Sequence, residues 1–142
     1  MEIRTLYDLA KQQNIEVFDF SLPETGSMSV MLEAGKCFVG MDASVRDGDA
    51  QERVHLGHEL GHCVTGSFYN IHAAADCRQK HENKANKWAI QQLIPVDDLD
   101  EAIAGGCTEI WELAERFGVT EEFMRRAVCY YVHGNVAAEL YF

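Results

Sequence analysis

The sequence predicts a single α+β domain in which a small antiparallel sheet packs on two long helices, with a helical tail after them. Three short segments between residues 15 and 41 alternate apolar and polar side chains, which is typical of strands. Two long helical patterns follow, at 49–65 and 75–93. The 142 residues and the 47% hydrophobic content suit one domain with one core. We divide this domain into a core at residues 1–95 and the tail at 96–142.

The first half of the chain is predicted to hold one helix and three strands. Its first residues place apolar side chains at helical spacing, and the second and third strands are separated by Ala34-Gly35, a dipeptide typical of tight turns. The last residues before the long helices are polar and acidic, which indicates a loop. We expect a helix at 2–13, strands at 15–20, 27–32 and 36–41, and a loop at 42–48.

The second half is predicted to be helical throughout. The helix at 75–93 ends before Pro95, because proline cannot continue a helix. Glycines at 105, 106 and 118 then separate shorter helical segments, for which Thr108 and Thr120 are candidate N-caps. We expect these helices at 96–104, 108–117 and 120–132.

Composition and charge restrict the partners. A formal net charge of −11 argues against direct nucleic acid binding, which depends on Lys and Arg displacing counterions from phosphates. A basic protein partner suits this acidic chain better. The longest apolar stretches fall short of the roughly 20 residues that cross a bilayer, and residues 1–10 lack the features of a signal peptide. We therefore expect a cytoplasmic protein that does not enter a membrane.

The five cysteines are an odd number and contain no Cys-x-x-Cys pair. This pattern fits neither a disulfide framework nor a cysteine-based zinc site, so we expect reduced thiols. Cys63 is expected to have a packing role. The cysteines are Cys37, Cys63, Cys77, Cys107 and Cys129.

The helix at 49–65 contains the run His58-Glu59-Leu60-Gly61-His62. Histidines four residues apart lie one turn above each other on a helix, so His58 and His62 can bind one metal ion. Glu59 projects about 100° round the helix from His58, beside the water that such an ion would bind. Zinc lowers the pKa of bound water towards about 7, and Glu59 would act as the catalytic base in peptide hydrolysis. The motif predicts one zinc ion and a peptidase.

A catalytic zinc ion needs a third protein ligand. The extension that supplies a third histidine is absent, because Thr65 and Phe68 occupy the positions of its glycine and its histidine. Glu82 is the favoured ligand, because it begins one helical face that is otherwise apolar or small. That face comprises Glu82, Ala85, Asn86, Ala89, Ile90 and Leu93. The residue pattern leaves Asp76, Cys77, His72 and His81 as alternatives.

Glycines on the motif helix indicate a close neighbour. Gly57 and Gly61 each weaken a helix by about 1 kcal/mol relative to alanine, so their presence predicts that another element packs tightly there. The alanines at 85 and 89 would allow the second long helix to be that element.

Several residues near the motif have two interpretations. Asn86, one turn after Glu82, either orients a metal ligand through a hydrogen bond or has a structural role. His55 either contacts the substrate or a ligand, or is an exposed histidine in the first helical turn, and we favour the exposed histidine. Four residues are candidates for stabilising an oxyanion, and the sequence does not distinguish among them. They are Tyr69, Tyr130, Tyr131 and His133.

Residues 53–95 resemble the ImmA/IrrE metallopeptidases, a gluzincin-like group of bacteria and their mobile elements. The resemblance rests on the run from Arg53 to His62 and on Glu82-x-x-Ala-Asn-x-x-Ala-x-x-Leu-Ile-Pro95, and the order of elements agrees along nearly the whole chain. Gly57 and His55 depart from the small apolar or hydroxyl residues that relatives often have. The resemblance implies a minigluzincin-like fold, with His58, His62 and Glu82 as zinc ligands and Glu59 as the catalytic acid/base.

Members of this family are typically anti-repressors that cleave a helix-turn-helix transcriptional repressor. The resemblance therefore implies a zinc endopeptidase acting on such a repressor in a phage or mobile-element circuit. The alternative is a zinc-dependent binding module that sequesters the repressor without cutting it.

Residues 113–127 themselves have the rhythm of a helix-turn-helix. Glu121 and Glu122 would begin its recognition helix, where carboxylates repel phosphates. We therefore expect a structural or protein-docking tail that does not bind nucleic acid directly.

Overall fold

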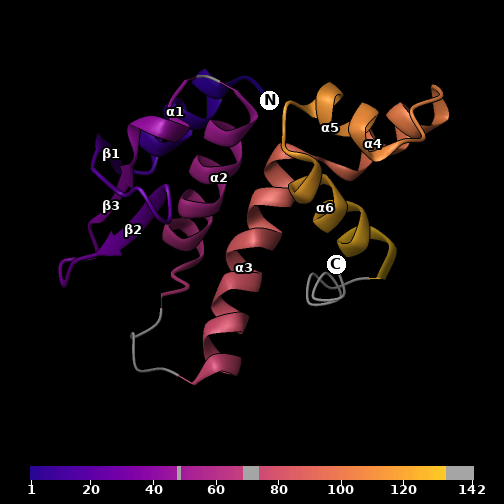
Figure 1. The fold of residues 1–142 in the computed structure, drawn as a ribbon. Helices are drawn as coiled ribbons and strands as arrows, with labels where there is room; N and C mark the ends of the chain where they lie inside the picture. Colours follow the sequence, from indigo (N-terminus) through magenta and orange to yellow (C-terminus); the bar gives the residue numbers. More distant parts are fainter. Residues whose placement is uncertain (48, 69–73, 134–142) are drawn as a thin grey trace.

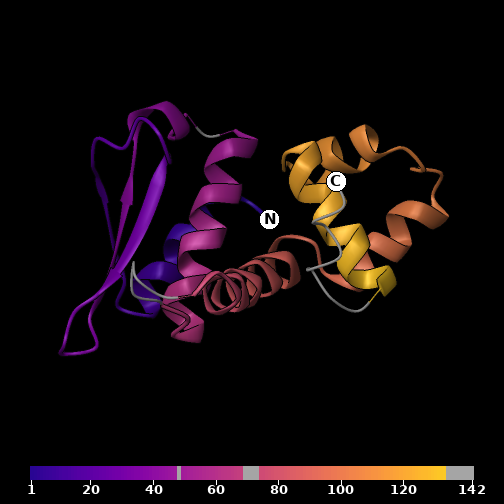
Figure 2. The ribbon, with the colours of Figure 1, turned by 60° about the horizontal axis from the view of Figure 1, so that its bottom comes forward.

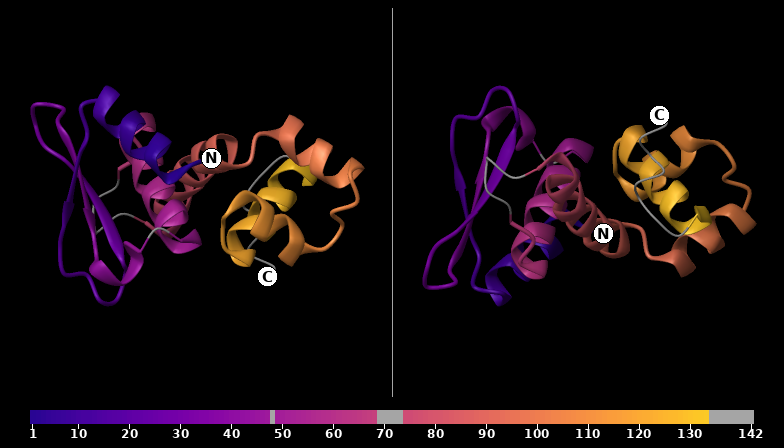
Figure 3. Two further views of the ribbon diagram at one scale, coloured as in Figure 1. Left: turned by 90° about the horizontal axis from the view of Figure 1, so that it is seen from above. Right: turned by 90° about the horizontal axis from the view of Figure 1, so that it is seen from below.

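A computed structural model describes residues 1–47, 49–68 and 74–133. It confirms the α+β class and the predicted order of elements (Figure 1). The elements are α1 (Ile3–Gln12), β1 (Glu16–Asp19), β2 (Ser27–Met31), β3 (Cys37–Met41), the 3-10 helix η1 (Ala43–Val45), α2 (Ala50–Thr65), α3 (Ala75–Leu93), α4 (Val96–Ala104), α5 (Ile110–Phe117) and α6 (Glu121–His133). The views from above and below show the sheet, the pair α2 and α3, and the tail helices following one another across the molecule (Figure 3).

The sheet is mixed, with strand order β1-β3-β2, so the prediction of a wholly antiparallel sheet was wrong. β2 and β3 pair antiparallel because a tight turn joins them, with Gly35 at a φ of 82°. β1 pairs with β3 in parallel, since residues 20–26 take the chain back across the sheet before β2 begins. Alternation of side chains reflects the pleat of a strand and does not report the direction of its partner.

Helix α2 lies between the sheet and α3 and contributes to the core on both sides (Figure 2). Leu56 and Leu60 of α2 are fully buried. The core includes side chains from the sheet, from α1 and from α3 that are equally inaccessible: Leu6, Val39, Met41, Ile90 and Leu93. Helix α2, which carries the His58–His62 motif, is therefore held between the sheet on one side and α3 on the other.

Helices α2 and α3 approach each other most closely at the predicted glycines. A Cβ atom placed on Gly61 would lie 2.4 Å from the backbone oxygen of Ala85, and one on Gly57 would lie 3.0 Å from Cδ1 of Leu93. Ala85 and Ala89 are completely buried in this contact. The prediction of tight helix packing is confirmed, and it brings Glu82 of α3 towards the histidines of α2.

Local capping marks the starts of α2, α5 and α6. The side chain of Asp49 accepts hydrogen bonds from the first turn of α2, and the Thr120 hydroxyl accepts one from the Phe123 amide at 3.2 Å, which confirms Thr120 as an N-cap. Thr108 is not an N-cap. Helix α5 starts at Ile110, with Glu109 as its N-cap, and the Glu109 amide donates to Glu112 at 3.3 Å.

The helical tail is joined to the core by polar contacts from both sides. The Arg53 guanidinium of α2 donates to the Gly118 carbonyl oxygen at 3.2 Å, and the Tyr131 hydroxyl donates to the Ile94 carbonyl oxygen at 2.6 Å. Burial, followed by the neighbouring Tyr130, raises the pKa of Tyr131 to about 12. Across the described residues, none of the helices combines the length and the apolar character needed to cross a membrane.

A disulfide bond joins Cys37 of β3 to Cys63 of α2, so the expectation that all five cysteines are reduced was wrong. The other three, Cys77, Cys107 and Cys129, are free thiols. Packing of β3 on α2 places the bonded residues with Cα atoms 6.0 Å apart, within the range that a disulfide spans. No sequence motif marks this pair, because 26 residues separate them and only tertiary packing brings them together.

Candidate metal centre and active site

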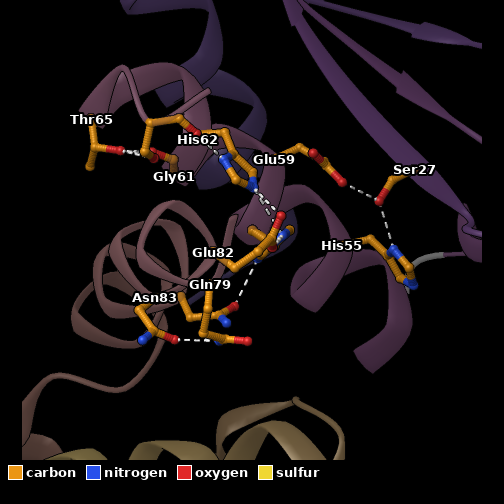
Figure 4. Close-up of polar contacts among 12 residues, drawn as sticks. Ser27, His55, Glu59, Gly61, His62, Thr65, Gln79, Glu82 and Asn83 are labelled. Carbon is orange, nitrogen blue, oxygen red and sulfur yellow. Dashed lines mark hydrogen bonds and ion pairs between the residues drawn. The ribbon is translucent and has the colours of Figure 1, made fainter. Parts of the chain in front are cut away.

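Three predicted ligands converge where α2 and α3 touch (Figure 4). The Nε2 atoms of His58 and His62 lie 3.2 Å apart. The two carboxylate oxygens of Glu82 lie 2.8 Å from Nε2 of His58 and 3.3 Å from Nε2 of His62. The ligand atoms of the three residues all lie within 4.8 Å of one another. The i, i+4 spacing on α2 and the tight α2–α3 contact together create this group.

The opposite nitrogen of each histidine is engaged by an oxygen acceptor. Nδ1 of His58 lies 2.8 Å from Oδ1 of Asn86, and Nδ1 of His62 lies 2.5 Å from the backbone oxygen of Ser67. Carbonyl oxygens only accept hydrogen bonds, so each Nδ1 carries the hydrogen and donates it. The lone pairs of both Nε2 atoms are then directed to the site, as metal-binding histidines require.

These contacts involve Asn86, which the sequence singled out, and Ser67, which it did not. The Asn86 amide oxygen contacts Nδ1 of His58, which supports the first of its two predicted interpretations. Ser67 contributes only its main-chain oxygen, so its residue type gave no indication of this role. The one local signal is Gly66, whose left-handed conformation ends α2 and turns the chain back towards His62.

The electrostatics of the site favour a cation. Burial alone would raise the pKa of Glu82, but hydrogen bonding to His58 and His62 holds it well below its usual range. Burial likewise opposes charge on His58, yet Glu82 and Glu59 raise the pKa of this ring above its usual value. Two imidazole nitrogens and one carboxylate match the donor set of a catalytic zinc site, so the residues fit the predicted ion.

The alternative third ligands do not join this group. Asp76 and Cys77 are exposed in the first turn of α3, and His81 does not belong to the group either. His72 lies outside the described residues. Within the part of the chain that the structure describes, Glu82 is therefore the one of these candidates that lies in the group with His58 and His62.

Glu59 is buried beside the metal ligands and is anchored from the sheet. Its Oε2 atom accepts a hydrogen bond from the Ser27 hydroxyl at 2.7 Å, and Nδ1 of His55 lies 2.7 Å from the same hydroxyl oxygen (Figure 4). His55 is half-buried, so the favoured expectation of an exposed histidine was wrong. Helix α2 begins at Ala50, which places His55 in the second turn, where it faces β2.

The metal-ligand group and Glu59 open into a cavity of about 560 Å³. Helices α2 and α3 form its floor, Thr25 and β2 form one wall, and α6 forms another through Phe123 and Arg126. Among the described residues that line the cavity, Arg126 is the one Lys or Arg side chain, and it pairs with Glu122 at 2.9 Å. Sequence reasoning did not identify Ser27 or Arg126, because both reach the site through long-range packing.

Three of the four candidate oxyanion stabilisers do not line the cavity. The Tyr130 hydroxyl accepts from Gln91 at 3.1 Å, the Tyr131 hydroxyl donates to a backbone oxygen, and His133 is exposed at the end of α6. Tyr69 lies outside the described residues. The structure therefore removes Tyr130, Tyr131 and His133 from this role.

Comparison with known protein families places the chain in one of them. The chain matches the sequence model of the IrrE N-terminal-like domain (Peptidase_M78) over residues 10–128. The matched range contains the three metal ligands, Glu59 and the cavity-lining part of α6. No curated protein is significantly similar to the chain in sequence.

Proposed function

The chain belongs to the IrrE N-terminal-like peptidase family, and from this premise we propose that it is a zinc-dependent endopeptidase. One observation carries the proposal. The Nε2 atoms of His58 and His62 and the carboxylate of Glu82 converge, while both histidine Nδ1 atoms are already engaged. Glu59 faces the same cavity one residue after His58. This is the donor set and the base that metal-assisted hydrolysis of a peptide bond needs.

His58, His62 and Glu82 would hold the ion, and zinc bound there would lower the pKa of water and polarise the substrate carbonyl group. Glu59 acts as the general base and then as the general acid. Its carboxylate takes a proton from the attacking water and returns it to the amine leaving group. The Ser27 hydroxyl donates to Oε2, whereas no hydrogen bond from the described residues reaches the other carboxylate oxygen, which is therefore free to take this proton.

The cavity wall suits an extended peptide. In the described part of the chain, β2 pairs only with β3, which leaves its other edge open, and Ser27, Met28 and Ser29 of β2 line the cavity. An extended peptide can add to such an edge through main-chain hydrogen bonds. A peptide bound along this edge would pass the metal ligands with its backbone, whatever the identity of the peptide's side chains.

We further propose that the substrate is a helix-turn-helix repressor in a phage or mobile-element circuit. The ImmA/IrrE resemblance supports this substrate, and the net charge of −11 is complementary to a basic DNA-binding protein. Glu121 and Glu122 at the start of α6 are exposed carboxylates, which supports a tail that does not itself bind DNA.

The test combines metal analysis with Glu59→Gln. Purified protein should contain one zinc ion per chain, and Glu59→Gln should retain it while losing roughly 100-fold or more of the cleavage rate on a repressor encoded by a neighbouring gene. Undiminished cleavage by Glu59→Gln would contradict the mechanism. Release of an intact repressor from DNA by both proteins equally would instead support sequestration without cleavage.

A further inference from the structure

Glu59 is the end of a short hydrogen-bonded chain that starts at His55. The Ser27 oxygen lies 2.7 Å from Oε2 of Glu59 and 2.7 Å from Nδ1 of His55. Ser27 and Glu59 are each only 7% exposed, so water does not readily replace either partner. Figure 4 shows Ser27 of β2 between His55 and Glu59, which both come from α2.

The hydrogens that each group can donate give this hydrogen-bonded chain a direction. A carboxylate only accepts hydrogen bonds, and a serine hydroxyl has a single hydrogen to donate. Ser27 therefore gives its hydrogen to Glu59, and its oxygen must accept from His55. The ring of His55 must carry its hydrogen on Nδ1, the nitrogen that faces Ser27.

The loop before β2 holds the His55 ring in this position. A Cβ atom on Gly26 would lie 2.8 Å from Cε1 and 3.3 Å from Nε2 of His55, so the ring packs directly on the backbone of that loop. Gly26 also has a φ of 83°, a conformation that side-chain-bearing residues rarely adopt. Because Gly26 is followed by Ser27, one rigid segment determines the positions of both the His55 ring and the Ser27 hydroxyl.

We propose that Ser27 and His55 are positioning residues for Glu59. His55 holds the Ser27 hydroxyl and Ser27 holds Oε2 of Glu59 through two hydrogen bonds of one direction, which fixes the orientation of the carboxylate that acts as the base. This inference rests on the proposed peptidase function. Neither Ser27 nor His55 belongs to the metal-ligand group, so their loss should reduce the rate of proton transfer without releasing the ion.

The first experiment needs no substrate. Nitrogen-15 NMR of the histidine side chains in the zinc-loaded protein reports which ring nitrogen of each histidine carries hydrogen. We expect His55 to be protonated on Nδ1, and Ser27→Ala to move it towards the Nε2 form. Protonation of wild-type His55 on Nε2 alone would overturn the proposal, because Ser27 would then donate to His55 and not to Glu59.

The second experiment is kinetic and uses a mixed library of fluorescence-quenched peptides. Ser27→Ala should lower kcat by about 10- to 100-fold, the effect expected of one hydrogen bond to a charged group, with KM and zinc content unchanged. Ser27→Thr retains the hydroxyl and should recover most of the rate. His55→Phe preserves an aromatic ring without the donor and should give a smaller loss than Ser27→Ala.

Ser44→Ala is the matched control. The Ser44 hydroxyl also donates to a carboxylate, that of Asp42 at 2.6 Å, but it lies outside the cavity, and its loss should leave kcat unchanged. Equal kcat for Ser27→Ala and wild type, or equal losses for Ser27→Ala and Ser27→Thr, would overturn the proposal. If wild type cleaves no peptide, the proposed function fails on its own, and the NMR result still decides the direction of the hydrogen-bonded chain.

Discussion

Substituting Gly61 with alanine should separate the two helices that form the metal centre. The added Cβ atom would lie 2.4 Å from the backbone oxygen of Ala85. Ordinary contact begins near 3.4 Å, so α2 and α3 would have to move apart by about 1 Å at this point. The obstructing atom belongs to the backbone, and no change of side-chain rotamer can relieve the clash.

The magnitude follows from two opposing effects. Alanine should stabilise the interior of α2 by about 1 kcal/mol relative to glycine. Overpacking of a well-filled core costs about 1–3 kcal/mol and more where backbone must move. We expect Gly61→Ala to lower the free energy of unfolding by about 2 kcal/mol. A shift of α3 also displaces Glu82 from the histidines, so zinc affinity should fall by roughly 10-fold or more.

Gly57→Ala provides the matched control on the same helix. Its added Cβ would lie 3.0 Å from Cδ1 of Leu93, the flexible end of a side chain that can move by a few tenths of an ångström. The gain in helix propensity is the same, so the stability should stay within about 1 kcal/mol of wild type. Urea unfolding of the metal-free proteins and competitive zinc titration measure both quantities. Equal unfolding midpoints for the two variants would refute the packing argument.

Three further predictions concern the metal centre and the disulfide. Asn86→Ala removes the acceptor at Nδ1 of His58 and should weaken zinc binding by about 10- to 100-fold in competitive titration; wild-type affinity would contradict its orienting role. In metal-free protein the His58–Glu82 ion pair stabilises the folded state, because folding raises the pKa of His58 and lowers that of Glu82. This contribution is complete between pH about 4.3 and about 6.5, the pKa values of the two groups in the unfolded chain. This contribution is lost as pH rises through the folded-state pKa of His58, so the stability difference from Glu82→Gln should be larger at pH 6 than at pH 8.5, and a constant difference would exclude the coupling. Reducing the Cys37–Cys63 bond, which closes a separation of 26 residues, should lower the free energy of unfolding by about 3 kcal/mol, and an unchanged urea midpoint in reductant would disprove this.

The group of candidate metal ligands could be predicted from the sequence because helical geometry is local. His58 and His62 share a face by their spacing alone, and Glu82 could be placed on the α2-facing side of its helix from the alanines that follow it. The limits of α3 and the N-cap at Thr120 were equally predictable, since proline and hydroxyl residues act on the backbone beside them.

Other features depended on contacts between residues far apart in the chain. The parallel pairing of β1 with β3, the Cys37–Cys63 disulfide and the Ser27–Glu59 hydrogen bond have no local signature. Each arises only when the sheet packs on α2, because that packing selects which strand edge, thiol or hydroxyl meets which partner. The sequence by itself was enough to predict the candidate ligands and the candidate base, through periodicity within single helices. The tertiary structure alone decided what contacts Glu59 and what encloses the cavity, because those contacts depend on how separate elements are packed together.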